Sequence, residues 1–305
     1  MNWKKIALFI FFAYAFIWVV ALIMKLAHID VNSIPGVICL ALFCMPAPAL
    51  ATFVIQKYIY KQGFKQYGWA FDKKAIKWLL LTPLFFIAFA LLVFAAIALF
   101  GNTHLLPAFG QVDFSQDGFN QRLQGLAGSK FGITKTQLPH IPALLLFVLM
   151  LVGCIIAGST INVPFTFGEE FGWRGLMFYE TKGMGFLKAN IFIGFIWGLW
   201  HLPIILMGYN YPHHPHTGAF MLILATISFS PLFAYIRLKT RSILGPSMLH
   251  GMVNATAGIF TLYVANFNEL YSSVVGVAGI IAGVVATIGI LIFDKKFLAG
   301  YRSIE

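Results

Sequence analysis

The chain has 305 residues, of which 60% are apolar (A, V, I, L, M, F, W, Y or C) and only 10% are charged. A soluble domain carries about 45–50% apolar and about 25% charged residues, so this composition excludes a water-soluble globule and predicts an integral membrane protein. The formal net charge of +11 would suggest a nucleic-acid partner in a soluble chain. The placement of the charges, described below, instead predicts no nucleic-acid partner.

Apolar runs long enough to cross a bilayer, about 20 residues each, recur along the chain. The first run follows Lys4 and Lys5 without a small-residue cleavage site, so we interpret it as a membrane helix and not as a removed signal peptide. The sequence predicts an all-α, polytopic bundle of about eight transmembrane helices, near residues 6–26, 34–56, 77–100, 141–166, 187–207, 217–237, 243–265 and 272–293. We divide it into an N-terminal three-span region, 1–140, and a C-terminal membrane region, 141–305. The polar stretch 101–140 is expected to be an exterior loop that carries a short amphipathic helix.

The basic residues are distributed unevenly between the two sides of this eight-span arrangement. One side has Lys25, Arg122, Lys130 and Lys135. The other side has seventeen: Lys4, Lys5, Lys57, Lys61, Lys65, Lys73, Lys74, Lys77, Arg174, Lys182, Lys188, Arg237, Lys239, Arg241, Lys295, Lys296 and Arg302. Because an excess of Lys and Arg marks the cytoplasmic side, both termini are expected to be cytoplasmic, in a bacterial cell membrane. Anionic lipid at that face is the expected partner of these charges.

Cysteines and a histidine-rich linker are two features that could have indicated other functions. All three cysteines lie inside apolar runs, which predicts buried thiols and no disulfide framework; they are Cys39, Cys44 and Cys154. His213, His214 and His216 are close enough in sequence to suggest a metal site. The prolines among them hold the backbone extended, and no carboxylate or thiol stands beside them, so an exterior loop is the favoured interpretation.

The first cluster of polar residues at membrane depth follows the fourth span and contains Glu169, Glu170 and Arg174. Ionisable groups at this depth are costly and indicate function by default. Glu170 and Arg174 are four residues apart, so on a helix they share a face and can form an ion pair. Glu169 is rotated by about 100° from Glu170 and has no such partner, which suits a general acid or base. The alternative for this cluster is a solvated turn at the membrane edge.

Two further clusters follow, in the fifth and seventh spans. His201 is the only titratable group of its span after Lys188, and Pro203 removes a backbone donor beside it, which predicts an irregular backbone. His250 and Asn254 are four residues apart on one helix face and could together stabilise an oxyanion. The alternatives are a buried histidine bonded to a carbonyl group, and polar residues that join neighbouring helices.

Taken together, a carboxylate base, two histidines and an amide indicate hydrolysis of an acyl bond by an activated water. No serine, threonine or cysteine stands with them in a way that suggests a covalent nucleophile.

The order and spacing of these residues resemble the CPBP or Abi family of intramembrane proteases, which includes the type II CAAX prenyl endopeptidases and relatives linked to bacteriocin immunity. The matching motifs are Glu169-Glu170-x-x-x-Arg174, an aromatic residue before His201, and His250-x-x-x-Asn254. The resemblance covers about 140–260, which makes 141–305 the catalytic region. Where the family has Phe four residues before the histidine, this chain has Trp197, an aromatic substitution that is expected to reshape the pocket.

The resemblance implies an intramembrane endopeptidase that acts on a membrane-associated peptide or protein, with CAAX-type processing of a prenylated peptide as one case. It implies that Glu169 and His201 activate the water and that His250 and Asn254 hold the oxyanion. Glu170, Arg174 and Trp197 would support the site. Family members are often called metalloproteases, so a zinc ion remains an open possibility beside a glutamate-dependent mechanism that needs no metal. A non-catalytic immunity or scaffold protein and a proton-coupled transporter are the two alternatives.

One expectation from helix geometry conflicts with this site. If the fourth span is a single helix from residue 141, Glu169 lies about 28 residues along it, near the cytoplasmic face. His201 would then lie deeper, towards the exterior, if the fifth span starts at 187. The clusters meet only if that span starts later, if helices tilt, or if Pro203 ends a helix.

Overall fold

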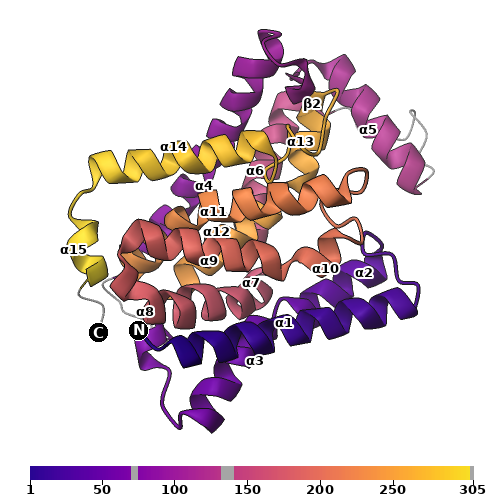
Figure 1. Cartoon of the computed structure of the whole chain (residues 1–305). Helices are drawn as coiled ribbons and strands as arrows, with labels where there is room; N and C mark the ends of the chain where they lie inside the picture. The colour runs from indigo at the N-terminus through magenta and orange to yellow at the C-terminus, as the bar shows by residue number, and fades with distance from the viewer. Residues whose placement is uncertain (70–74, 132–140, 303–305) are drawn as a thin grey trace.

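The structure is a computed structural model that describes residues 1–69, 75–131 and 141–302. These residues form a helical bundle with a single two-stranded ladder, which confirms the predicted all-α membrane fold. Lys73, Lys74 and Lys135, and the end of the predicted loop at 132–140, lie outside the described residues. Figure 1 shows the bundle coloured along the chain.

Among the residues that the structure describes, four helices are long and apolar enough to cross a membrane, and they match four of the predicted spans closely. They are α1 (Trp3–Leu26), the segment Ile34–Ile59, the segment Ile76–Asn102, and α11 (Pro215–Thr240). The segment Ile34–Ile59 consists of α2 (Ile34–Cys39), η1 (Leu40–Cys44), α3 (Ala47–Phe53) and η2 (Val54–Ile59), and Ile76–Asn102 consists of α4 (Ile76–Ile97) and η5 (Ala98–Asn102).

The predicted number of eight full-length spans is not confirmed within the described residues, because the other four apolar runs are bent, short or interrupted. The fourth run is a bent pair: α6 (Ala143–Ser159) meets Val163–Met184 at 60°, giving five spans if the pair counts as one. The fifth and eighth contain the shorter helices α9 (Phe186–Trp200) and α14 (Val277–Phe293). The seventh is divided into α12 (Leu244–Asn254) and α13 (Ala257–Tyr263).

The remaining elements are short and connect these helices. After the bend come α7 (Val163–Glu170), η8 (Phe171–Met177), α8 (Phe178–Thr181) and η9 (Lys182–Met184), and α10 (Leu202–Ile205) follows α9. The others are η3 (Lys65–Tyr67), η6 (Pro107–Phe109), β1 (Gln111–Val112), α5 (Gln116–Phe131), β2 (Val264–Ala265) and α15 (Phe297–Arg302).

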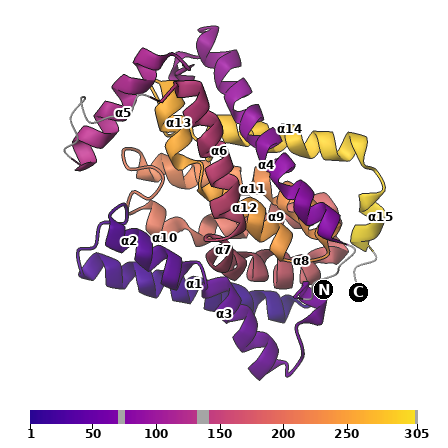
Figure 2. The ribbon, with the colours of Figure 1, turned by 180° about the vertical axis from the view of Figure 1, so that it is seen from behind.

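Helix α11 forms the centre of the bundle. Inside its apolar window 72% of the residues are buried, against 28% for α1, so α11 packs against protein on most sides while α1 presents most of its surface to lipid. Figures 1 and 2 both show α9, α11 and α12 between a layer made by α1–α3 and the helices α4, α6 and α13. Gly194 and Gly198 let α9 approach the α11 backbone closely, because a Cβ at Gly198 would lie 2.6 Å from the Cα of Ile223.

The bend between α6 and α7 places the end of α7 beside α12. Pro164 lies in the first turn of α7, where a missing N–H is tolerated, so a new helix begins at Val163 instead of continuing α6. Thr166 donates a hydrogen bond to the carbonyl of Ser247 on α12, at 2.8 Å. Gly251 also lets α12 approach α6 closely, since its Cβ would lie 2.6 Å from the carbonyl oxygen of Gly158. About one turn beyond Thr166 on α7 and Ser247 on α12 stand Glu170 and His250.

Both ends of the described chain lie on the same side of the bundle (Figures 1 and 2). Helix α8 contacts both, because Lys5 forms an ion pair with Glu180 at 3.2 Å and Phe178 packs edge-on against Tyr301 at 5.2 Å between ring centroids. The strands β1 and β2 pair antiparallel at the opposite end, where α5 supplies the helix predicted within 101–140.

Arg122 of α5 attaches the end that carries β1 and β2 to the bundle. Its Nε donates to the carbonyl of Leu262 at 2.6 Å, and its Nη1 forms an ion pair with Asp113 at 2.9 Å. Hydrogen bonding by Ser115, together with Arg122, lowers the pKa of Asp113 from 3.8 to about 2. Because the folded pKa lies below the unfolded value of about 3.9, this pair stabilises the fold fully above about pH 4.

We therefore expect Asp113→Asn to lower the free energy of unfolding by about 1 kcal/mol at pH 7, a value reduced for the partial exposure of the pair. The difference from the wild type should shrink as the pH falls from about 4 towards 2, where Asp113 becomes protonated. Thermal unfolding followed by tryptophan fluorescence at pH 7 and at about pH 2 measures the difference in stability. Asp117→Asn, at an exposed position, is the matched control. A difference that is equal at both pH values would contradict the assignment.

Candidate active site

Glu170, Arg174 and His250 form a buried ionic cluster where α7, η8 and α12 meet. Oε1 of Glu170 lies 3.2 Å from Nη1 of Arg174, so the predicted pairing is present. The same oxygen lies 2.9 Å from Nδ1 of His250. A carboxylate oxygen only accepts, so the proton between them belongs to Nδ1 and the other ring nitrogen of His250, Nε2, is left for other partners. The bond to His250 joins residues 80 apart in sequence.

The Arg174 side chain is held from several sides by neutral groups. Its guanidinium lies over the ring of Trp197 at 4.4 Å and over the ring of Phe233 at 4.8 Å. Nη2 also lies 3.3 Å from the hydroxyl oxygen of Ser230. Arg174 and Glu170 are both fully buried. A buried pair of this kind requires good geometry to offset its desolvation, and stacking on two aromatic faces contributes to that.

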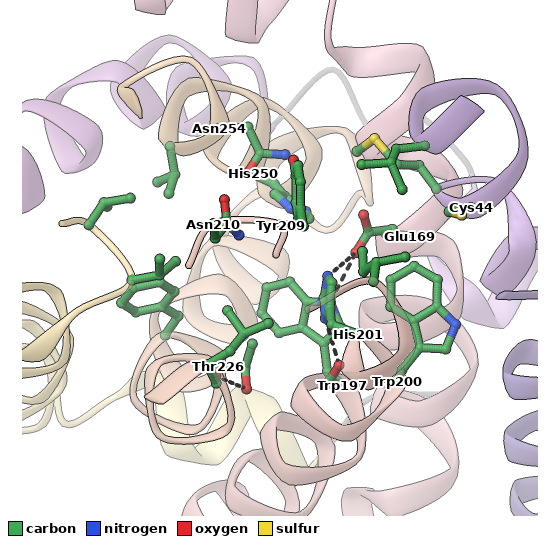
Figure 3. A pocket seen from close by; sticks show the side chains of 18 of the residues that line it. Cys44, Glu169, Trp197, Trp200, His201, Tyr209, Asn210, Thr226, His250 and Asn254 are labelled. Carbon is green, nitrogen blue, oxygen red and sulfur yellow. Dashed lines mark hydrogen bonds and ion pairs between the residues drawn. The ribbon is translucent and has the colours of Figure 1, made fainter. Parts of the chain in front are cut away.

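Glu169, although adjacent to Glu170, points to a different place. Its Oε2 accepts a hydrogen bond of 2.9 Å from the indole nitrogen of Trp197 on α9. Within the described chain, Oε1 of Glu169 has no hydrogen-bond partner. Oε2 lies 4.0 Å from Nε2 of His201, too far for a direct hydrogen bond. Figure 3 shows Glu169, Trp197 and His201 grouped on one side of a cavity.

His201 lies in the predicted break of the fifth span, between the end of α9 and the start of α10. Its Nδ1 lies 2.9 Å from the backbone carbonyl oxygen of Trp197. Because a carbonyl oxygen cannot donate, Nδ1 carries the proton and Nε2 is an acceptor in the neutral ring. The expected conflict in depth between Glu169 and His201 is absent. It assumed a single helix from residue 141, whereas a new helix, α7, starts at Val163 after the bend, and Pro203 lies in the first turn of the separate helix α10.

A cavity of about 140 Å³ connects Glu169, His201, His250 and Asn254 (Figure 3). A volume of that size holds several water molecules or part of a peptide. Asn254 ends α12, on the same face as His250, and among the described residues its side chain has no hydrogen-bond partner. The remainder of the wall is mostly apolar, and α2–α3 contribute to it through Leu40, Cys44 and Met45.

Sequence reasoning missed several residues that line this cavity, namely Cys44, Tyr209, Asn210 and Thr226. The hydroxyl of Thr226 donates a hydrogen bond to the carbonyl of Gly194 at 2.9 Å. Cys44 and Cys154 are buried, free thiols as predicted, while Cys39 is only partly buried. Asn210 has a positive φ of 62° and Gly208 one of 96°, conformations in which Asn and Gly are enriched, so these two residue types were a local signal for a turn in the linker.

Among the described residues, no three His, Cys, Asp or Glu side chains are grouped to hold a metal ion. A catalytic zinc usually needs three protein ligands. Here His250 faces Glu170 through Nδ1, and only Glu169 and His201 approach each other. This set does not fit a zinc site, and the chemistry described below passes through no metal.

The histidine-rich linker has a carboxylate partner that its sequence does not reveal. Glu269, from the loop after β2, lies 3.0 Å from Nδ1 of His214 and accepts from the backbone N–H of His213 at 2.9 Å. No carboxylate stands beside these histidines in the sequence of the linker, but Glu269 does so in the folded chain. The linker is held against the loop after β2, since Tyr211 also donates to the carbonyl of Val275 at 2.7 Å.

Comparison with known proteins identifies the segment that contains Glu169, His201, His250 and Asn254. Residues 139–256 match the model of the family described as type II CAAX prenyl endopeptidase Rce1-like. A curated relative, CAAX prenyl protease 2 of Methanococcus maripaludis, is 25% identical over 134 residues, which is 42% of this chain and 46% of that protein. The match thus spans less than half the length of that relative. Over residues 139–256 the chain matches the Rce1-like family, and the resemblance predicted from its three motifs is confirmed.

Proposed function

We propose that this protein is an intramembrane endopeptidase that hydrolyses a peptide bond with a water held by Glu169 and His201. The observation that carries the proposal is the meeting of Glu169, His201, His250 and Asn254 at one cavity, from three separate helical segments. The match of this segment to a family of prenyl endopeptidases supports it.

Two hydrogen-bond acceptors face each other across the position proposed for the water. Oε2 of Glu169 and Nε2 of His201 are 4.0 Å apart, and neither can donate to the other while Glu169 is ionised and His201 neutral. One water molecule with two hydrogen bonds of about 2.8 Å spans such a gap. Both of its O–H groups are then used, so a lone pair of its oxygen remains available for attack on a carbonyl carbon.

In the proposed reaction, the water oxygen forms a bond to the carbonyl carbon while Glu169 takes one of the water protons. The electron pair of the C=O double bond moves to the carbonyl oxygen. When this tetrahedral intermediate collapses, the C–N bond breaks and the proton passes from Glu169 to the leaving nitrogen. The products are a carboxylic acid and an amine, and both residues return to their first state.

His250 and Asn254 would stabilise the negative oxygen of that intermediate. His250 already donates from Nδ1 to Glu170, so it must be doubly protonated to donate from Nε2 as well. The carboxylate of Glu170 lies between this positive charge and that of Arg174 and partly balances both. One carboxylate and two cations leave a net positive charge next to the oxyanion, which is the electrostatic arrangement that acyl hydrolysis requires.

The substrate in this proposal is a membrane-associated peptide, either the prenylated C-terminal segment suggested by the name of the curated relative or another membrane peptide. We place both termini in the cytoplasm of a bacterial cell, with the lysines of that face against anionic lipid. The experiment incubates the purified protein in detergent with a farnesylated CAAX peptide and with an unmodified transmembrane peptide, and maps the products by mass spectrometry. Cleavage of either peptide supports the proposal, and recovery of both peptides intact would overturn it.

Loss of one oxyanion donor should slow the reaction without weakening substrate binding. We expect Asn254→Ala to reduce kcat by about 10²–10³-fold with little change in KM, because the amide acts on charge that develops only in the transition state. Steady-state kinetics on the cleaved peptide measure both constants. The control is Asn120→Ala on α5, far from the cavity. A rise in KM at constant kcat would assign Asn254 to binding instead.

A further inference from the structure

We infer that Trp197 is the positioning residue of this site: its indole N–H and its backbone carbonyl together set the two acceptors that hold the water. The effect of Trp197 on the water rests on the proposed function, whereas its contacts with Glu169 and His201 do not. The N–H donates to Oε2 of Glu169 at 2.9 Å, and the carbonyl accepts from Nδ1 of His201 at 2.9 Å.

The indole ring is held in place because it packs against neighbouring side chains on several sides. Only 3% of Trp197 is exposed. The guanidinium of Arg174 lies over the ring at 4.4 Å, and the rings of Phe233 and His250 pack against it with centroids at 5.8 and 5.4 Å. A side chain held in this way has one orientation, and its N–H therefore has one direction. That direction is occupied by Glu169.

The bond determines which oxygen of Glu169 faces His201. A buried indole N–H needs an acceptor, and a carboxylate provides a charge-assisted one. With Oε2 engaged, the carboxylate is held in one orientation, so Oε2 stays 4.0 Å from Nε2 of His201 and its second lone pair is available to the water. Without the N–H, the carboxylate could turn about its last bond, and the 4.0 Å separation from His201 would no longer be fixed. Phenylalanine at this position fills similar space but has no donor.

Trp173 offers a matched control for the substitution to Phe. It is fully buried, its indole nitrogen has no partner within the described chain, and it packs against Phe9 instead of lining the cavity. Trp173→Phe and Trp197→Phe remove the same atoms from a packed interior, so their losses of stability should be similar. Only Trp197→Phe removes a hydrogen bond to Glu169.

The experiment measures kinetics and the bond itself in the full-length protein in detergent. We expect Trp197→Phe to lower kcat about 10- to 100-fold, as loss of a hydrogen bond to a charged group does, with KM within about threefold of the wild type. Trp173→Phe should retain wild-type kcat. If the wild type cleaves peptide and both variants match it in kcat, the inference is overturned while the proposed function stands.

The second measurement does not depend on activity. Protein labelled with 15N-tryptophan gives one indole signal for each of its seven tryptophans. The signal that disappears in Trp197→Phe is expected to shift upfield in its proton dimension in Glu169→Ala, because the strong acceptor is gone, whereas the Trp173 signal stays in place. An unmoved Trp197 signal would show that no such bond exists and would overturn the inference even if the wild type cleaved nothing.

Discussion

Glu169→Gln is expected to reduce peptide cleavage by about 10²–10⁴-fold, the contribution of a general base, while the protein unfolds at an unchanged temperature. The amide keeps the size of the side chain, and its carbonyl oxygen can still accept from the indole of Trp197, 2.9 Å from the present Oε2. It cannot accept a proton from water. Rates of peptide cleavage and thermal unfolding, measured on the same preparation, test the two halves of this prediction.

The same variant separates the proposed protease from its two alternatives. A non-catalytic immunity or scaffold protein would retain its phenotype in cells with Gln at position 169. A transporter that relays protons would show proton-coupled uptake in proteoliposomes that the variant abolishes, without any peptide product. Full cleavage activity in Glu169→Gln would remove Glu169 from the mechanism.

Glu170→Ala is expected to have the largest effect on stability, a loss of about 3–5 kcal/mol, although it is adjacent to Glu169. The substitution leaves Arg174 fully buried without its carboxylate at 3.2 Å, and it removes the acceptor of His250 at 2.9 Å. The cost is that of a buried, uncompensated charge. Thermal unfolding of the purified variant measures it, and a poor yield from membranes is expected as well.

The control for this prediction removes both charges. A double variant, E170L/R174M, should regain part of the lost stability, because two apolar side chains can replace a buried ion pair at little cost. Activity should not return, since His250 still lacks the carboxylate that balances its charge. If Glu170→Ala unfolds like the wild type, the ionic cluster does not stabilise the fold as the geometry indicates.

Sequence periodicity predicted the elements that are governed by local rules. The uninterrupted apolar runs became the helices Trp3–Leu26, Ile34–Ile59, Ile76–Asn102 and Pro215–Thr240. The spacing of Glu170 and Arg174 predicted their ion pair, and Pro203 predicted the break beside His201. In each case the interaction depends on neighbours within about one helical turn, which a sequence displays directly.

The features that the sequence did not predict depend on the direction of helices and on contacts between distant segments. Hydropathy averages over about 20 residues, so it does not detect a change of direction such as the 60° bend at residues 160–162. Because of that bend, Glu169 and His201 meet at one cavity, whereas the sequence had placed them at different depths. Contacts between distant segments are equally invisible: Glu170 with His250, and Trp197 with Glu169, join residues 80 and 28 apart. The motifs named the participating side chains, but which carboxylate faces which histidine depends on how α7, α9 and α12 cross.

The contribution of Leu40, Cys44 and Met45 to the cavity has a consequence for how such a protein diversifies. These wall residues precede residue 139, where the match to the endopeptidase family begins, whereas all the proposed catalytic groups follow it. Part of the cavity wall and the proposed catalytic groups are thus encoded in different stretches of the chain. Under the proposed function, we expect that exchanging the segment Ile34–Ile59 between relatives alters which peptides fit, while Glu169, His201, His250 and Asn254 stay unchanged.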